Sequence, residues 1–109
     1  MELLTSEELK QKIENGEKIM VDFWASFCGP CKVLKPIFES VSKIVKEDSS
    51  SVNLYTFNIE TDMDYMRELG LRSVPTIKGF SNGEEIFSEV GIKRKNDLLE
   101  MVNKLNLLK

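Results

Sequence analysis

The chain has 109 residues, of which 41% are hydrophobic and 30% charged, so we expect a single domain over residues 1–109 with an apolar interior. Fifteen basic and eighteen acidic residues give a formal net charge of -3, the wrong sign for neutralising phosphates, so no nucleic acid is expected as a partner. Since the chain contains no histidine, hydrolases with a catalytic histidine and metal sites built on histidine are excluded.

The first predicted elements are a brief strand at residues 2–4 and a short helix. Thr5 and Glu8 have the spacing of a capping box, in which each side chain accepts a hydrogen bond from the other residue's backbone N–H. The helix that follows should end near Asn15. The run 19–25 is almost continuously apolar, which predicts a strand buried on both faces of a parallel sheet.

The alternation of strands and helices continues after the cysteines. Apolar residues recur at spacings of three and four over residues 33–45, which predicts a long helix with one buried face. Residues 52–59 predict a second buried strand. Thr61 or Asp62 can cap a short helix that Gly70 ends in a left-handed turn.

A hairpin and a final helix complete the pattern. Residues 76–80 and 85–90 flank Asn82-Gly83, which suits the positive backbone angles of a tight turn, so these strands should be antiparallel. Gly79 indicates a bulge or a close approach. Together the elements predict an α/β fold with a mixed sheet between helices. The last helix has its apolar stripe at Leu98, Met101, Val102 and Leu105.

The two cysteines, Cys28 and Cys31, belong to one Cys-Gly-Pro-Cys segment. A closed zinc site needs about four nitrogen or sulfur ligands, and this chain offers two sulfurs and no histidine. A structural disulfide is the next alternative, but a cross-link gains little stability from closing so short a loop. The segment therefore predicts a redox-active dithiol.

The cysteines come where a buried strand should end and a helix begin, with Pro30 at a favoured first helical position. Free N–H groups and the positive end of the helix dipole stabilise a thiolate on Cys28, so we expect its pKa to lie below that of a free thiol. Cys31, one turn further on, can return to Cys28 and close the ring, as a resolving thiol does. The alternative is that Cys31 is an ordinary buried hydrophobic residue.

Asp22 is an acid in the middle of an apolar strand. Burial disfavours its charged form, so we expect a raised pKa and proton exchange near neutrality. If Asp22 lies beneath the cysteines, it can accept the proton of Cys31 directly or through a water molecule. The alternative is a strand-end aspartate paired with a backbone group or a lysine.

The segment 21–32, VDFWASFCGPCK, followed by Pro36, closely resembles the active-site segment of thioredoxins. The resemblance covers nearly the whole chain, because residues 74–76 are similar to the family's cis-proline loop and residues 80–91 to its late hairpin. It implies a thioredoxin fold with a five-stranded mixed β-sheet sandwiched by four helices. It also implies a thiol-disulfide oxidoreductase that reduces protein disulfides through a mixed-disulfide intermediate.

By this resemblance Cys28 is the attacking cysteine, Cys31 the resolving cysteine and Asp22 the buried acid below them. A substrate segment would pair with the backbone of Val74 as an added strand. Simpler alternatives stay open, namely core packing for Trp24 and Phe27 and a trans turn for Pro75. The substrate-binding surface implied by the resemblance consists of Trp24, Phe27, Gly29, Pro30, Val74, Pro75 and Gly91.

Two positions depart from the family pattern. Phe27 stands where many thioredoxins have tryptophan, so a ring N–H donor is lost while the apolar contact remains. Thr56 stands where many have a lysine near the buried acid, so the pKa of Asp22 should be higher than it would be beside a positive charge.

The resemblance implies no cofactor other than the Cys28–Cys31 disulfide, protein disulfides as substrates, a thioredoxin reductase as electron donor and ribonucleotide reductase among the acceptors. We expect a monomer. We also expect it in the cytoplasm without a membrane partner, since the sequence has no secretion signal and no apolar run of about 20 residues. Two alternatives stay open. One is a glutaredoxin-like carrier that uses glutathione, although its dipeptide is usually Pro-Tyr, and the other is a non-catalytic binding subunit of a larger assembly.

Overall fold

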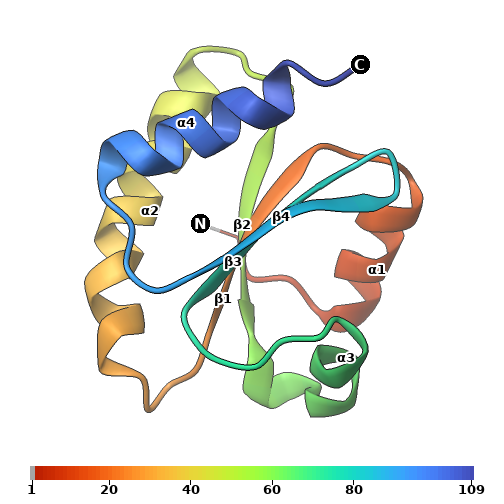
Figure 1. Cartoon of the computed structure of the whole chain (residues 1–109), viewed down its shortest axis with the longest axis vertical. Coiled ribbons are helices and arrows are strands. Elements are labelled where there is room, and N and C mark those ends of the chain that lie inside the picture. The colour runs from red at the N-terminus through yellow and green to blue at the C-terminus, as the bar shows by residue number, and fades with distance from the viewer. Residues whose placement is uncertain (1) are drawn as a thin grey trace.

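The computed structural model describes residues 2–109, which form four α-helices, four strands and one 3-10 turn. A mixed sheet lies between two pairs of helices, with two helices on each face (Figure 1). This confirms the predicted α/β fold. The helices are α1 (Ser6–Glu14), α2 (Gly29–Glu47), α3 (Met63–Glu68) and α4 (Lys95–Asn106), and the strands are β1 (Ile19–Trp24), β2 (Asn53–Asn58), β3 (Thr76–Ser81) and β4 (Glu84–Val90), with the turn η1 (Ile59–Thr61) after β2.

The strand order across the sheet is β2-β1-β3-β4. β1 runs parallel to β2 and antiparallel to β3, and β3 and β4 form the predicted hairpin. Trp24, the last residue of β1, is the register partner of Asn58, the last residue of β2. The two segments that follow these strands therefore leave the sheet side by side.

The fifth strand that was predicted at residues 2–4 is reduced to a single bridge between Leu3 and Thr56. The N–H of Leu4 donates to the carbonyl of Thr56, and the N–H of Thr56 donates to the carbonyl of Glu2, both at 3.0 Å. The ladder cannot continue because the next residue, Thr5, already caps α1. The sheet formed by residues 2–109 thus has four strands, and the prediction of five was wrong.

The local turn signals are confirmed. The side chains of Thr5 and Glu8 form both hydrogen bonds of a capping box, at 3.1 and 2.9 Å. Asn82 and Gly83 have φ angles of 56° and 82°, as a tight hairpin turn requires. Gly70 ends the short helix with a φ of 72°.

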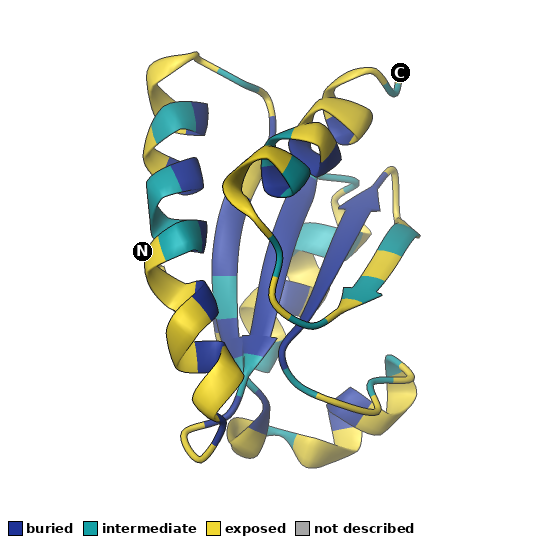
Figure 2. Ribbon diagram, turned by 60° about the vertical axis from the view of Figure 1, so that its left-hand side comes forward, coloured by how far each residue is buried: buried dark blue, intermediate teal, exposed yellow. Residues whose placement is uncertain are grey.

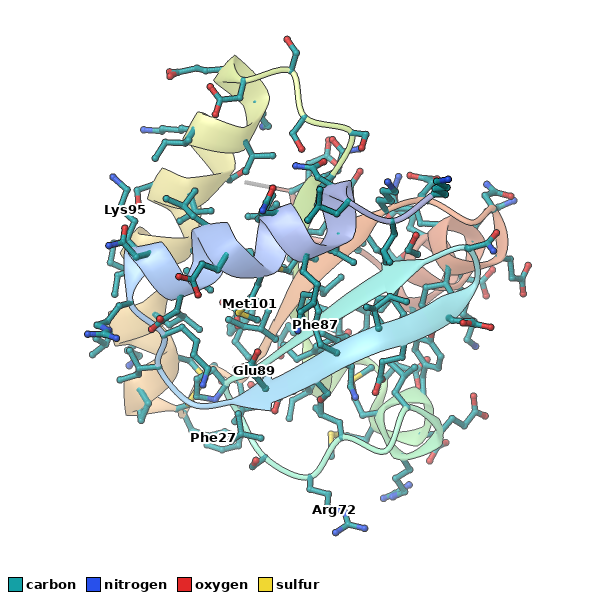
Figure 3. All side chains as sticks on the ribbon, turned by 45° about the horizontal axis from the view of Figure 1, so that its top comes forward. Phe27, Arg72, Phe87, Glu89, Lys95 and Met101 are labelled. Atoms are coloured by element: carbon teal, nitrogen blue, oxygen red, sulfur yellow. A yellow bond between two sulfur atoms is a disulfide. The ribbon has the colours of Figure 1, made fainter. Side chains whose placement is uncertain are left out.

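Gly79 combines a bulge with a close approach. The register of β3 and β4 shifts between Gly79 and Phe80. A Cβ atom at Gly79 would collide with the ring of Phe87, which lies over the glycine from β4. Phe87 and Met101 of α4 face each other between the sheet and the helix (Figure 3).

Each face of the sheet has its own apolar cluster. α2 and α4 pack on one face through residues such as Phe38 and Leu98, and α1 and α3 pack on the other through Leu9 and Met66. The central strands are buried while the outer helix surfaces are exposed (Figure 2). Within residues 2–109 no helix is long and apolar enough to span a bilayer.

Candidate functional site

Cys28 and Cys31 form a disulfide at the amino end of α2, where the sequence predicted a dithiol. Their Cα atoms lie 5.3 Å apart, and both residues are buried. Cys28 is the N-cap residue of α2, and its Sγ accepts a hydrogen bond from the N–H of Cys31 at 3.2 Å. Pro30 is the second helical residue, one position later than predicted, because α2 already begins at Gly29. The helix therefore directs a free N–H group at the first sulfur.

Asp22 lies in β1 with only 2% of its surface exposed. Its Oδ1 has no hydrogen-bond partner among residues 2–109, so this oxygen does not make the backbone or lysine pairing that was the alternative. Burial raises the pKa of Asp22 from its ordinary value of 3.8 to about 7. A carboxyl with this pKa can take up and release a proton at neutral pH.

An open pocket of about 560 Å³ brings Asp22 and Cys31 to one surface. Thr56 also lines it and is the register partner of Asp22, as expected for the position where many thioredoxins have a lysine. Threonine offers no positive charge, which agrees with burial alone setting the raised pKa of Asp22. The remaining lining residues are Leu3, Trp24, Ala25, Ser26, Lys32, Lys35 and Glu39.

The residues around the disulfide differ in exposure. Phe27 is 76% exposed, so core packing does not account for it. Trp24 is half-buried, packs against the core cluster and also lines the pocket. Gly29 and Pro30 are exposed, and a Cβ atom at Gly29 would meet no atom within 4 Å. Phe27 thus lies on the surface at the end of the molecule that also carries Arg72 (Figure 3).

Two further loops contribute the remaining predicted residues. The Val74-Pro75 peptide bond is cis, which decides between the two isomers that the sequence left open. Val74 is half-buried and packs against the core cluster that contains both cysteines. Gly91 has a φ of 98°, and its N–H donates to the carbonyl of Pro75 at 2.9 Å. This hydrogen bond joins the proline loop to the end of β4.

The sequence reasoning missed Glu60, whose carboxylate accepts hydrogen bonds from the backbone N–H and the hydroxyl of Ser26. Ser26 and Glu60 each follow the end of their strand by two residues, and the two strands are parallel neighbours. That equal offset is a signal that the sequence contains. It becomes useful only when the strand register is known.

Comparison with known proteins identifies relatives over most of the chain. The profile of the family described as thioredoxin matches residues 1–104. Thioredoxin from Rickettsia felis is 41% identical over 95 residues, which cover 87% of this chain and 88% of that protein. Thioredoxin from Malassezia sympodialis is 34% identical over 92 residues, which cover 84% of this chain and 86% of that protein.

Solved structures show the same fold. The crystal structure of Malassezia sympodialis thioredoxin matches with a TM-score of 0.84 and 28% identity, covering 96% of this chain and 92% of that chain. The structure of Plasmodium falciparum thioredoxin matches with a TM-score of 0.83 and 25% identity, covering 95% and 98%. The sequence matches and the matches of fold thus indicate the same family.

Proposed function

This chain belongs to the thioredoxin family of protein-disulfide oxidoreductases, and on that premise we propose a role for each residue of its site. Its redox group is its own cysteine pair, since thioredoxins use no external cofactor. The proposed roles rest above all on the disulfide at the amino end of α2, beside a pocket that reaches Asp22.

In the reduced protein, the thiolate of Cys28 attacks one sulfur of a target disulfide. The target S–S bond breaks, a mixed disulfide forms, and the second target sulfur leaves as a thiolate. Cys31 then attacks the sulfur of Cys28, which releases the first target sulfur and closes the Cys28–Cys31 disulfide. Two electrons pass to the target in all. The N–H of Cys31 donates a hydrogen bond to the sulfur of Cys28. This supports Cys28 as the attacking cysteine, because such a bond stabilises its thiolate.

Asp22 serves as the base for the second step. Cys31 must lose its proton before it attacks, and Asp22 borders the same pocket. Because burial raises its pKa to about 7, the carboxylate can accept this proton and later return it to solvent. Asp22→Asn removes this function and should slow the resolution of the mixed disulfide. Equal resolution rates for both proteins at every pH would contradict the role.

The exposed side chain of Phe27, the open backbone at Gly29 and the loops of Pro75 and Gly91 support a substrate-binding surface around the disulfide. An extended target segment pairs there with the backbone of Val74, while its side chains contact the apolar rings. Trp24 and Pro30 complete this surface. Phe27→Ala should weaken target binding while the rate of resolution stays unchanged.

A pair of matched variants tests the roles of the two cysteines. With Cys31→Ser, the first step proceeds and the second cannot, so a mixed disulfide with the target should accumulate and be detected by mass spectrometry under non-reducing conditions. With Cys28→Ser, which makes the same chemical change at the other sulfur, no such adduct should form. An adduct that forms only with Cys28→Ser would reverse the assignment.

We further propose protein disulfides as natural targets, a thioredoxin reductase as electron donor and ribonucleotide reductase as one acceptor, with the chain working as a monomer in the cytoplasm. The support is membership of the thioredoxin family. Catalytic amounts of the chain should reduce an exposed protein disulfide faster with purified thioredoxin reductase and NADPH than with glutathione. A preference for glutathione would argue against the reductase as donor.

A further inference from the structure

A carboxylate joins the segment before α2 to the turn η1 that follows β2. Oε1 of Glu60 accepts a hydrogen bond from the backbone N–H of Ser26 at 2.5 Å, and Oε2 accepts one from the hydroxyl of Ser26 at 3.1 Å. Ser26 lies between β1 and α2, and Glu60 lies in η1 after β2. Because Trp24 and Asn58 end the two parallel strands as register partners, residues two positions further on emerge side by side.

Both partners of this contact are held in place by their own segments. On one side, the Oδ1 of Asn58 accepts the N–H of Glu60 at 3.0 Å, and the hydroxyl of Thr61 donates to the carbonyl of Asn58 at 2.7 Å. On the other side, the N–H of Cys28 donates to the carbonyl of Ala25 at 3.2 Å, which closes a turn around residues 26 and 27. Glu60 thus reaches the turn from a fixed position.

The N–H of Ser26 points out of this turn, and its hydrogen-bond acceptor in the described chain is Glu60. A charged acceptor with two bonds to one residue gives a stronger and more directional contact than a neutral one. The same two bonds lower the pKa of Glu60, the bond from the backbone N–H being the larger cause, so the carboxylate is ionised at neutral pH. The contact is therefore present under the conditions in which the disulfide exchanges.

We infer that Glu60 is a positioning residue for the disulfide chemistry, which holds the turn of residues 25–28 through Ser26 and so fixes Cys28 as the N-cap of α2. The thiolate of Cys28 is stabilised by the amino end of α2 only while its sulfur stays in line with the free N–H groups of the helix. Without the Ser26–Glu60 contact, which anchors the turn, the sulfur of Cys28 moves out of line with the helix for part of the time. The fraction of Cys28 present as a stabilised thiolate then falls.

The charge of Glu60 and its hydrogen bonds have opposite effects on the stability of the Cys28 thiolate, and this makes the inference testable. A negative charge near Cys28 disfavours the thiolate, so its loss alone should speed alkylation of the reduced protein. Loss of the anchor should slow alkylation. Glu60→Gln removes the charge but keeps an amide oxygen for the N–H of Ser26 and an amide N–H for its hydroxyl. Glu60→Ala removes both the charge and the bonds.

The experiment measures the rate of iodoacetamide alkylation of the reduced proteins at pH 7, with mass spectrometry to identify the labelled cysteine. Glu60→Gln should react within about twofold of the unmodified protein, and Glu60→Ala about 3 to 10 times more slowly than Glu60→Gln. Asp64→Ala is the matched control. It removes an exposed carboxylate from α3, one that pairs with Arg67 and does not touch the turn, and should leave the rate unchanged.

Equal rates for Glu60→Ala and Glu60→Gln, or a faster rate for Glu60→Ala, would overturn the inference. If Glu60→Ala does not fold, as judged by circular dichroism, Glu60→Asp replaces it, because it keeps the charge and shortens the reach. Glu60→Asp should then react more slowly than the unmodified protein, which carries the same charge with the anchor intact, and an equal or faster rate would overturn the inference. The inference rests on the role proposed for Cys28, and mapping the label separates the two failures. Preferential labelling of Cys31 in the unmodified protein contradicts the proposed function, whereas equal rates among the variants contradict only the positioning role.

Discussion

Replacing Asp22 by asparagine should stabilise the folded chain at pH 8 and do so far less at pH 4. The carboxyl is buried to 2% exposure, and its Oδ1 has no hydrogen-bond partner among residues 2–109. At pH 8 the folded protein must therefore hold a charge that burial opposes, whereas asparagine is neutral and nearly the same size.

The size of the effect follows from the difference in proton binding between the folded and unfolded chain. The pKa of Asp22 is about 7 when folded and 3.8 in its ordinary state. Below about pH 4 both states carry the proton. Between about pH 4 and 7 only the unfolded chain has released it, so stability falls by about 1.4 kcal/mol per pH unit. Above about pH 7 the loss is complete and amounts to about 4 kcal/mol.

Urea denaturation of the oxidised proteins at several pH values measures this effect, because the closed disulfide keeps the cysteines from titrating. The free-energy difference between Asp22→Asn and the unmodified protein should grow from pH 4 to pH 7 and then level off. Asp64→Asn is the control, since Asp64 is exposed and paired with Arg67, and its difference should stay small. Parallel stability curves for Asp22→Asn and the unmodified protein would refute the reasoning.

Three further predictions have defined outcomes in denaturant unfolding. Gly79→Ala should cost about 1–3 kcal/mol because the new methyl group collides with the ring of Phe87, and a cost below about 0.5 kcal/mol would contradict this geometry. Thr5→Ala removes the capping box and should cost about 1 kcal/mol, a value that an unchanged midpoint would exclude. Lys78 is buried and donates to Glu85 at 2.7 Å, so Glu85→Gln should cost about 1–3 kcal/mol while Lys78→Met costs less. The reverse order would show that the ion pair itself stabilises the hairpin.

The sequence predicted the features that depend on nearest neighbours along the chain. The capping box at Thr5, the turn at Asn82-Gly83 and the helix start at the cysteines each need only a few adjacent residues, and the structure has all of them. The burial of Asp22 was predictable for the same reason, because its apolar neighbours on the strand are visible in the sequence. Local chemistry was therefore sufficient for the centre of the site.

Features that depend on which strands pair were not predictable in this way. A lysine is expected at the surface, yet Lys78 is buried in β3, which lies between β1 and β4. The contact between Ser26 and Glu60 requires the register of β1 and β2. The predicted strand at residues 2–4 is reduced to one bridge because the next residue, Thr5, is the N-cap of α1 and cannot extend the hydrogen-bond ladder.

β4 is one of the two outer strands of the sheet, and the bulge at Gly79 distorts its pairing with β3. Glu84, Glu85 and Glu89 lie along this strand. Charged side chains on an outer strand and an irregular ladder both disfavour continuous pairing with the edge of a second molecule. The β4 edge of the sheet thus carries two of the features by which sheet proteins disfavour edge-to-edge association.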